Sequence, residues 1–236
     1  MVKFGLSSLS VDGAKAALAS EMAGWDFEAT AAAAKKAWNS ELGKIDSQTT
    51  DATARTIFYT ALYHTMVAPS IFCDVDGSYY GADKQNHKSD GFMNYTTYSL
   101  WDTYRAAMPL MSVIHKDTMP DVVNTMIYIH QQQGKLPVWH LMGCETDCMV
   151  GNPGVIAVAD AIIKKTPGVD PVIAYKACKE SVMLDERGQG FRKQYGYIPS
   201  DLYNTSVSCD MEYAIADACV AQAALVMAEA YPADKD

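Results

Sequence analysis

The sequence lacks a long apolar run, a basic cluster and a dense set of cysteines. No stretch approaches the roughly 18 to 20 consecutive apolar residues that cross a bilayer, so we expect no membrane-spanning segment. The formal net charge of −9 leaves no Lys/Arg surface for neutralising phosphates, which argues against nucleic acid as a partner. The six cysteines are spread over 236 residues, so we expect reduced, mainly buried thiols rather than a disulfide scaffold.

Several common catalytic signatures are also absent from the sequence. There is no Gly-x-Ser-x-Gly motif, which argues against a serine hydrolase of that kind. Neither a Gly-x-Gly-x-x-Gly fingerprint nor a P-loop occurs, so nucleotide chemistry is not indicated. Cys144, Cys148 and His140 offer three possible zinc ligands, but Cys-x3-Cys without a second pair is a weak zinc signal.

What is present is a succession of helical patterns. Residues 2–11 have the pattern of a single β-strand, and residues 28–42 that of an alanine-rich linker helix. From Thr50 onward, apolar residues recur at helical spacing between short polar turns. The further helices are expected at 51–67, 97–114 with a bend near Pro109, 117–133, 154–165, 171–184 and 208–230. The last is apolar nearly all round, as an inner helix would be.

Successive helix pairs without intervening strands form either an α-solenoid or a closed α/α toroid. A recurring motif with a period of roughly 33 to 47 residues is absent, which disfavours the solenoid. We therefore expect a mainly α chain, in which residues 50–236 form part of an α/α toroid. Residues 1–49 would supply a single strand and a linker helix.

The segment 136–151, LPVWHLMGCETDCMVG, contains the strongest candidate for acid catalysis. It places Glu145 shortly after Trp139, in a glycine-punctuated turn. An apolar ring beside a carboxyl group disfavours its charged form, so the group can hold a proton for a leaving oxygen. The indole also offers a flat surface to a pyranose. The alternative is a solvated loop carboxylate or a cap.

A second candidate site lies in YSLWDTYR, residues 98–105, where Trp101, Asp102 and Arg105 fall within one helical turn. An aromatic plane, an acid and a forked donor match the apolar face and the hydroxyl rim of a sugar. An ion pair between Asp102 and Arg105 over a core tryptophan is the alternative. Asp74 and Asp76 alternate like the ligands of a metal loop but lack the rest of an EF-hand, so we expect a capped turn near the substrate.

Seven segments, in order, resemble glycoside hydrolase family 92, the calcium-dependent exo-acting α-mannosidases. They are FYTALYH (58–64), FCDVDG (72–77), YTTYSLWDTYR (95–105), LPVW (136–139), GCETDCMVG (143–151), GYIPS (196–200) and SVSCDMEYA (206–214). The resemblance implies a β-sandwich joined through linker helices to an (α/α)6 barrel, with inversion at the anomeric carbon. It implies Glu145 as general acid, and Trp101, Asp102, Arg105, Trp139, Asp74 and Asp76 as sugar contacts.

The resemblance also implies parts that this sequence does not contain. An inverting enzyme needs a second carboxylate about 6.5 to 9.5 Å from the acid to activate water. In the family that base lies in a downstream Gly-Asn-(Asp/Glu)-Asp-Cys-Gly-Gln segment, and most calcium ligands also come later, so no metal ligand is assigned here. Cys144 and Asp147 stand where the family usually has asparagines.

The resulting expectation is an incomplete α-mannosidase that acts on N-glycans or mannans and does not turn over alone. The alternative is a noncatalytic glycan-binding or scaffolding half-barrel that needs a complementary chain and self-associates through its open edge. The resemblance implies secretion or a periplasmic location. The start of the sequence, Met-Val-Lys-Phe-Gly, lacks the layout of a cleavable leader, so the compartment stays open.

Overall fold

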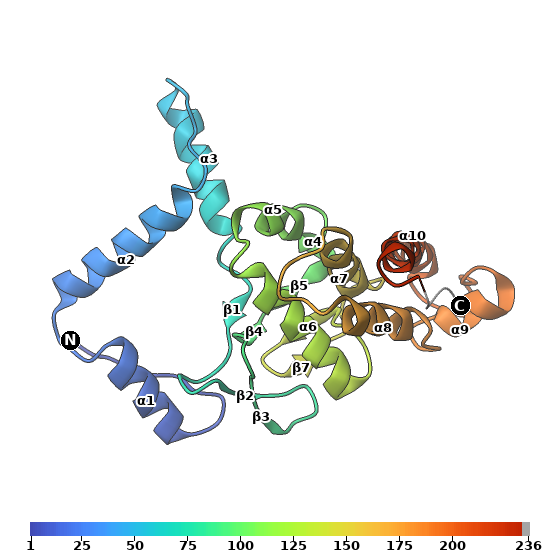
Figure 1. The fold of residues 1–236 in the computed structure, drawn as a ribbon, viewed down its shortest axis with the longest axis horizontal. Coiled ribbons are helices and arrows are strands. Elements are labelled where there is room, and N and C mark those ends of the chain that lie inside the picture. Colours follow the sequence, from blue (N-terminus) through green and yellow to red (C-terminus); the bar gives the residue numbers. More distant parts are fainter. Residues whose placement is uncertain (233–236) are drawn as a thin grey trace.

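The computed structural model describes residues 1–232, and these are mainly helical (Figure 1). The helices are α1 (Val11–Glu21), α2 (Phe27–Leu42), α3 (Ala52–His64), α4 (Leu100–Thr103), α5 (Ala107–Ile114), α6 (Met119–Gln133), α7 (Pro153–Ile163), α8 (Pro171–Val182), α9 (Gln189–Tyr195) and α10 (Ser206–Ala230). The strands are β1 (Ser70–Ile71), β2 (Ser78–Tyr80), β3 (Asn86–Lys88), β4 (Tyr95–Thr96), β5 (Tyr98–Ser99), β6 (Trp139–Leu141) and β7 (Cys144–Glu145).

Helices α1, α2 and α3 project from the body of the molecule as an arm (Figure 1). Neither α1 nor α2 has a buried residue, and Leu62 is the one buried residue of α3. The predicted strand at residues 2–11 is wrong, because residues 1–10 form no strand and Val11 already begins α1. The Ser10 hydroxyl caps α1 by accepting the Gly13 N–H at 2.9 Å, and an isolated strand would have had no partner.

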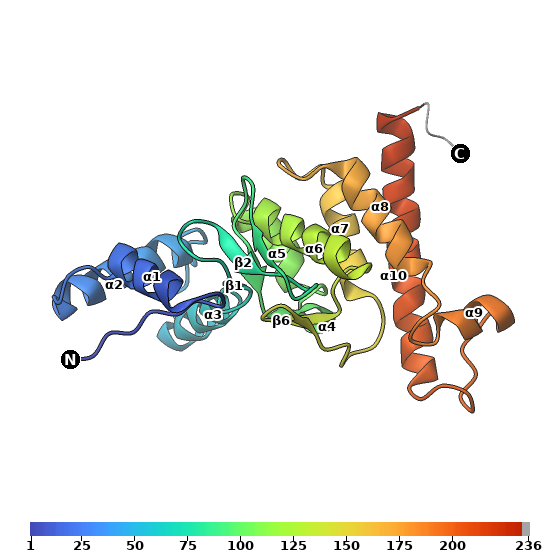
Figure 2. The same cartoon turned by 90° about the horizontal axis from the view of Figure 1, so that it is seen from below.

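The core lies where α6, α7, α8 and α10 pack against one another. Figure 2 shows α10 running across α7 and α8 at one end of the body. The buried residues of these four helices are dominated by small and β-branched side chains: Val122, Val123, Val155, Val158, Ala159, Ala174, Ala177, Ala216 and Ala223. Small side chains let helix axes approach closely, so a dense interior forms from short helices.

Three of the predicted helix boundaries are confirmed by their caps. The Asp170 carboxylate accepts the N–H groups of Val172 and Ile173 at 2.9 and 3.1 Å, and α8 begins at the following proline. Gly134, with φ of 83°, ends α6 in the left-handed conformation. Asp51 caps α3 in the same way as Asp170 caps α8.

The prediction of one helix at 97–114 is wrong. These residues form β5, α4 and α5, and the chain breaks at Ala106 rather than at Pro109. Pro109 instead lies in the first turn of α5, where a missing N–H costs nothing. The structure also has a short helix that the sequence did not predict: α9 lies between the left-handed glycines Gly188 and Gly196.

Three small antiparallel sheets stand beside the helices, with strand orders β1-β4, β2-β3 and β5-β6-β7. The three-stranded sheet positions the candidate site. Its register sets Ser99 opposite Trp139 and His140 opposite Glu145. The short α4 segment therefore begins directly beside the strands that carry Trp139 and Glu145.

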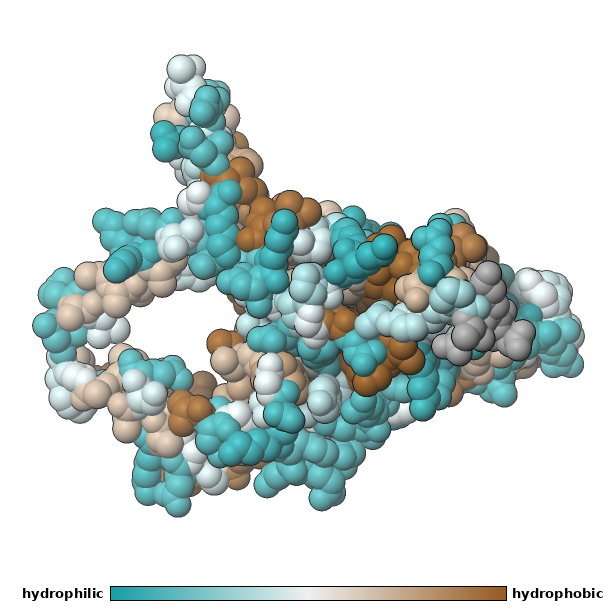
Figure 3. Space-filling model, in the orientation of Figure 1, coloured by the Kyte–Doolittle hydropathy of each residue, from teal (hydrophilic) through white to brown (hydrophobic). Residues whose placement is uncertain are grey.

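Helix α10 has one packed side and one open side. It contacts α7 and α8, yet Val207, Met211 and Leu225 are exposed. By length and composition alone α10 could cross a membrane. In the described part of the chain, 22% of its most apolar window is buried. Apolar residues also gather over the body around α7 and α8 in Figure 3. The described residues form stacked helices and do not by themselves show a closed ring of six helix pairs.

Candidate active site

The β5-β6-β7 sheet sets the Glu145 carboxylate against backbone N–H groups of the segment around it. Glu145 Oε2 accepts the Val138 N–H at 2.9 Å. Glu145 Oε1 accepts the N–H groups of Trp139 and Asp147 at 2.9 and 3.0 Å. Both carboxyl oxygens are thus engaged by the backbone, which differs from the apolar surroundings expected from the sequence. Oε2, with one partner, is the oxygen that has room for a further contact.

An ionic network holds the segment after Glu145, residues 146–152, which we call the Glu145 loop. Lys135 Nζ contacts Asp147 at 2.8 Å and Glu186 at 2.7 Å, and Arg187 Nε lies 3.5 Å from Asp147. Burial lowers the pKa of Lys135, but its hydrogen bonds to the two carboxylates outweigh burial and leave that pKa raised. The Arg187 guanidinium also donates to the carbonyls of Met149 and Gly151. Lys135 and Arg187 therefore both hold the Glu145 loop in place.

Trp101 and Arg105 meet on a residue that the sequence analysis did not assign, Glu212 of α10. Glu212 Oε1 accepts Trp101 Nε1–H at 3.3 Å and Arg105 Nη2–H at 2.5 Å, and Oε2 accepts the Tyr104 hydroxyl at 2.8 Å. Burial, the hydrogen bond to Glu212 and its charge raise the pKa of Tyr104 to about 12. We call Trp101, Tyr104, Arg105 and Glu212 the Glu212 cluster. Glu212 lies within SVSCDMEYA, one of the segments that carry the family resemblance, and that is the signal that could have found it.

The ion pair between Asp102 and Arg105, considered as the alternative, does not form. Asp102 Oδ2 accepts the Ser99 hydroxyl at 2.6 Å, whereas Arg105 pairs with Glu212. The Arg105 guanidinium carbon lies 5.2 Å from the centre of the Trp101 ring and 4.6 Å from that of Tyr104. Arg105 therefore covers one side of the indole, and a sugar that stacks on Trp101 must use the other.

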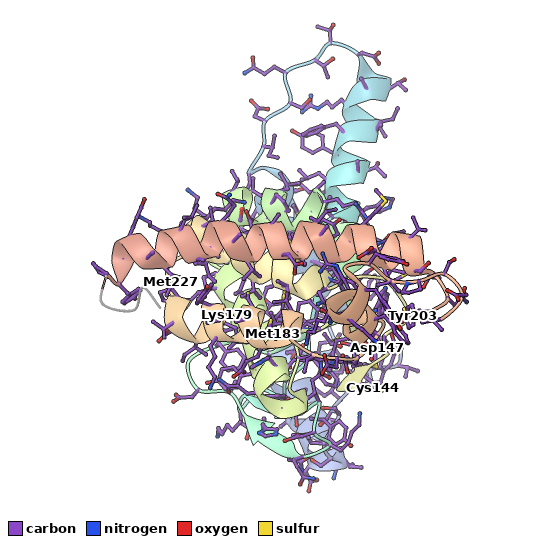
Figure 4. The ribbon with its side chains drawn as sticks, turned by 90° about the vertical axis from the view of Figure 1, so that its right-hand side faces the viewer. Cys144, Asp147, Lys179, Met183, Tyr203 and Met227 are labelled. Atoms are coloured by element: carbon purple, nitrogen blue, oxygen red, sulfur yellow. The ribbon has the colours of Figure 1, made fainter. Side chains whose placement is uncertain are left out.

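The Glu145 loop touches the Glu212 cluster at Gly151. A methyl group built at Gly151 would lie 2.4 Å from Glu212 Cβ, so a glycine is needed for this approach, and its φ of 77° also favours glycine. In Figure 4, Cys144 and Asp147 lie with Tyr203 toward the N-terminal end of α10, while Met227 lies near its other end. The Glu145 loop and the Glu212 cluster are therefore in contact at Gly151.

Asp74 and Asp76 serve a turn that precedes β2. Asp74 Oδ2 accepts the Ser7 hydroxyl at 2.8 Å, and Asp76 accepts the Ser78 N–H and hydroxyl at 3.0 and 2.9 Å. The Ser78 hydrogen bonds lower the pKa of Asp76. The capped turn is confirmed, and no hydrogen bond within residues 1–232 joins either carboxylate to the Glu212 cluster.

The zinc alternative has little support in the part of the chain that the structure describes. No group of three or more His, Cys, Asp or Glu residues there is arranged to hold a metal ion. Cys144 and Cys148 are exposed, whereas His140 is buried. Burial lowers the pKa of His140 to about 4, and its Nδ1 has no hydrogen-bond partner among residues 1–232. His140 therefore faces the interior rather than the two thiols.

The fold is similar to parts of two solved bacterial enzymes. The family GH92 α-mannosidase BT3965 from Bacteroides thetaiotaomicron is 37% identical, with a TM-score of 0.90 over 95% of this chain and 30% of that chain. The same values hold for BT3965 in complex with mannoimidazole. The inverting family GH92 mannosidase BT2199, from Bacteroides thetaiotaomicron VPI-5482, is 28% identical, with a TM-score of 0.85 over 96% of this chain and 33% of that chain. No curated protein matches the chain.

The fold and its relatives define part of a glycoside hydrolase catalytic domain. Residues 13–235 match the profile of the glycosyl hydrolase family 92 catalytic domain. The chain belongs to glycoside hydrolase family 92. It spans about a third of the length of the solved enzymes that it resembles.

Proposed function

We propose that this chain contributes to an α-mannosidase that removes terminal α-mannose from N-glycans or mannans with inversion. The observation that carries the proposal is the family match over residues 13–235. It is supported by the TM-score of 0.90 with BT3965, an α-mannosidase, and by the likeness to BT2199, an inverting mannosidase. Because the chain spans 30 to 33% of those enzymes, the activity is proposed for a catalytic domain of which these residues are one part.

In this proposal Glu145 is the general acid and gives its proton from Oε2. That oxygen has one backbone partner, whereas Oε1 has two, so a proton on Oε2 disturbs the fewest contacts. Trp101 offers the side of its ring that Arg105 leaves open to the sugar, and Arg105 and Asp102 offer a donor and an acceptor to its hydroxyl groups. Trp139, Asp74 and Asp76 complete the proposed contacts.

The catalytic base and the calcium ligands are proposed to come from residues outside this sequence. Family 92 enzymes depend on calcium, which would bind mannose hydroxyls and help to distort the ring. The described residues do not fit that ion, because they contain no group of three or more candidate ligands. The part assigned to this chain is therefore the acid and one side of the sugar pocket.

The test is a chimaera in which this chain replaces the matched segment of BT3965. The TM-score of 0.90 and the coverage of 95% of this chain make the exchange geometrically reasonable. We expect the chimaera to release mannose from 4-nitrophenyl α-mannoside in the presence of calcium, and the isolated chain to release none. A folded but inactive chimaera, checked by circular dichroism, would contradict the proposal.

A second candidate function is noncatalytic glycan binding or scaffolding by a half-barrel that requires a complementary chain. The open apolar side of α10, with Val207, Met211 and Leu225 exposed, favours it. Size-exclusion chromatography of the isolated chain reports self-association through this side. Retained mannose binding together with an inactive chimaera would favour this candidate over the enzyme.

A further inference from the structure

We propose that Glu212 is a positioning residue, which fixes Trp101 and Arg105 in the orientation that receives the sugar. The inference rests on the proposed function for its meaning, because Trp101 and Arg105 are proposed sugar contacts. It goes beyond that function by assigning a role to a residue on α10, far along the chain from the tryptophan and arginine that it holds. The hydrogen bonds from Trp101 and Arg105 to Glu212 are a property of this chain and can be measured without turnover.

The first argument is the convergence of donors on one carboxylate. An indole N–H, a phenol O–H and a guanidinium N–H, from three residues in and just after α4, all reach Glu212. Helix α4 has only four residues and no side-chain cap, so its own hydrogen bonds fix it poorly. Glu212 supplies what the short helix lacks, since three bonds from one carboxylate restrict the rotation of three side chains at once.

The second argument concerns burial and charge. The Glu212 side chain is 12% exposed, whereas that of Arg105 is 46% exposed. The carboxylate is thus the inner, fixed partner, and the guanidinium is the outer one, with donors left for a ligand. The hydrogen bond to Glu212, opposed by a smaller effect of burial, raises the pKa of Arg105, as expected for a charge-assisted pair.

The third argument concerns the kind of donor that Glu212 binds. All three hydrogen bonds to its carboxylate come from side chains, and two of those side chains, Trp101 and Arg105, are proposed sugar contacts. The three hydrogen bonds to Glu145, in contrast, come from backbone N–H groups. A change at Glu212 therefore acts directly on the orientation of Trp101 and Arg105.

The fourth argument is the contact between Glu212 and Gly151. The backbone of the Glu145 loop approaches the Cβ atom of Glu212. The position of α10 therefore affects both where the loop lies and how the Trp101 side chain is oriented. Another ionic group on the same helix shows a contrast. Arg192 of α9 pairs with Asp210 and Asp217 of α10 at 2.8 and 2.5 Å, and within the described residues none of these three forms a hydrogen bond or ion pair with Trp101, Tyr104 or Arg105. Asp210 consequently provides a matched control on α10.

The experiment combines a spectroscopic and a kinetic measurement on Glu212→Gln, with Asp210→Asn as control. In the full chain labelled with 15N, the Trp101 indole N–H resonance is identified by its loss in Trp101→Phe. We expect it to move in Glu212→Gln, because a charged acceptor becomes neutral, and to stay in place in Asp210→Asn. In the chimaera with BT3965, we expect Glu212→Gln to raise KM for 4-nitrophenyl α-mannoside about tenfold, with kcat changed less than about threefold.

A Trp101 resonance that does not move overturns the inference, whether or not the chimaera is active. An unchanged KM, or a loss confined to kcat, overturns it as well. If Glu212→Gln does not fold, Glu212→Asp keeps the charge, withdraws the carboxylate by one methylene and is measured in the same two ways. An inactive chimaera with native Glu212 counts against the proposed function alone, because the Trp101 indole resonance still tests whether Glu212 holds this side chain.

Discussion

Replacing Glu145 with glutamine in the chimaera should lower kcat/KM for methyl α-mannoside by about 10³-fold, within the range typical of general acids. A neutral amide cannot give a proton to the departing oxygen. Hydrolysis of 2,4-dinitrophenyl α-mannoside, whose leaving group needs no proton, should fall much less. The variant should also lose about 2 kcal/mol of stability, because three backbone N–H groups lose a charged acceptor.

Asp147→Asn is the matched control for Glu145→Gln. Asp147 lies in the same loop and pairs with Lys135 and Arg187, but no role in proton transfer is proposed for it. It should therefore change both rates by less than about threefold, as a loss of partly exposed ion pairs would. Equal losses on the two substrates in Glu145→Gln would contradict the acid assignment and leave Glu145 with the turn-closing role alone.

Replacing Gly151 with alanine should destabilise the chain by about 2 to 5 kcal/mol, the sum of left-handed strain and overpacking. The added methyl group would lie 2.4 Å from Glu212 Cβ, so either the Glu145 loop or α10 must move. Thermal unfolding followed by circular dichroism measures the loss. The Trp101 indole resonance should shift in the same variant, because displacement of α10 carries Glu212 with it.

Gly134→Ala separates the two causes of that loss. Gly134 also has a positive φ, 83°, but a methyl group there would have no heavy atom within 4 Å. Its substitution should cost only the left-handed strain, about 1 to 2 kcal/mol. If the two alanine variants unfold at the same denaturant concentration, the close contact between Gly151 and Glu212 has no energetic weight.

The helices that the sequence predicted best are those whose boundaries depend on neighbouring capping residues. Asp170 followed by Pro171 starts α8, and Gly134 ends α6, because caps act within a turn of the residues they stabilise. The strand at the start of residues 97–114 was missed for the same reason. Tyr98 and Ser99 pair with β6, and this long-range pairing overrides the helical spacing there.

In the candidate site, too, local features could be predicted from the sequence and long-range contacts could not. Trp101 and Arg105 were selected from residue type and spacing, and the structure does bring them together. Their shared partner is Glu212, which lies more than 100 residues away along the chain. A local sequence pattern cannot predict a contact between residues so far apart. Asp102 is the acid nearest to Arg105 in the sequence, and it was therefore considered as the alternative partner. Likewise, three backbone N–H groups around Glu145 depend on how β6 and β7 pair, and the sequence suggested only the neighbouring indole.

The proposal of an inverting α-mannosidase is tested most directly by the anomer that the chimaera releases first. Proton NMR of the reaction with 4-nitrophenyl α-mannoside, recorded before mutarotation, distinguishes the two anomers of free mannose. We predict that β-mannose appears first and that its signal then decays toward the equilibrium mixture. Release of α-mannose first, or no mannose from a folded chimaera, would contradict the function proposed for this chain.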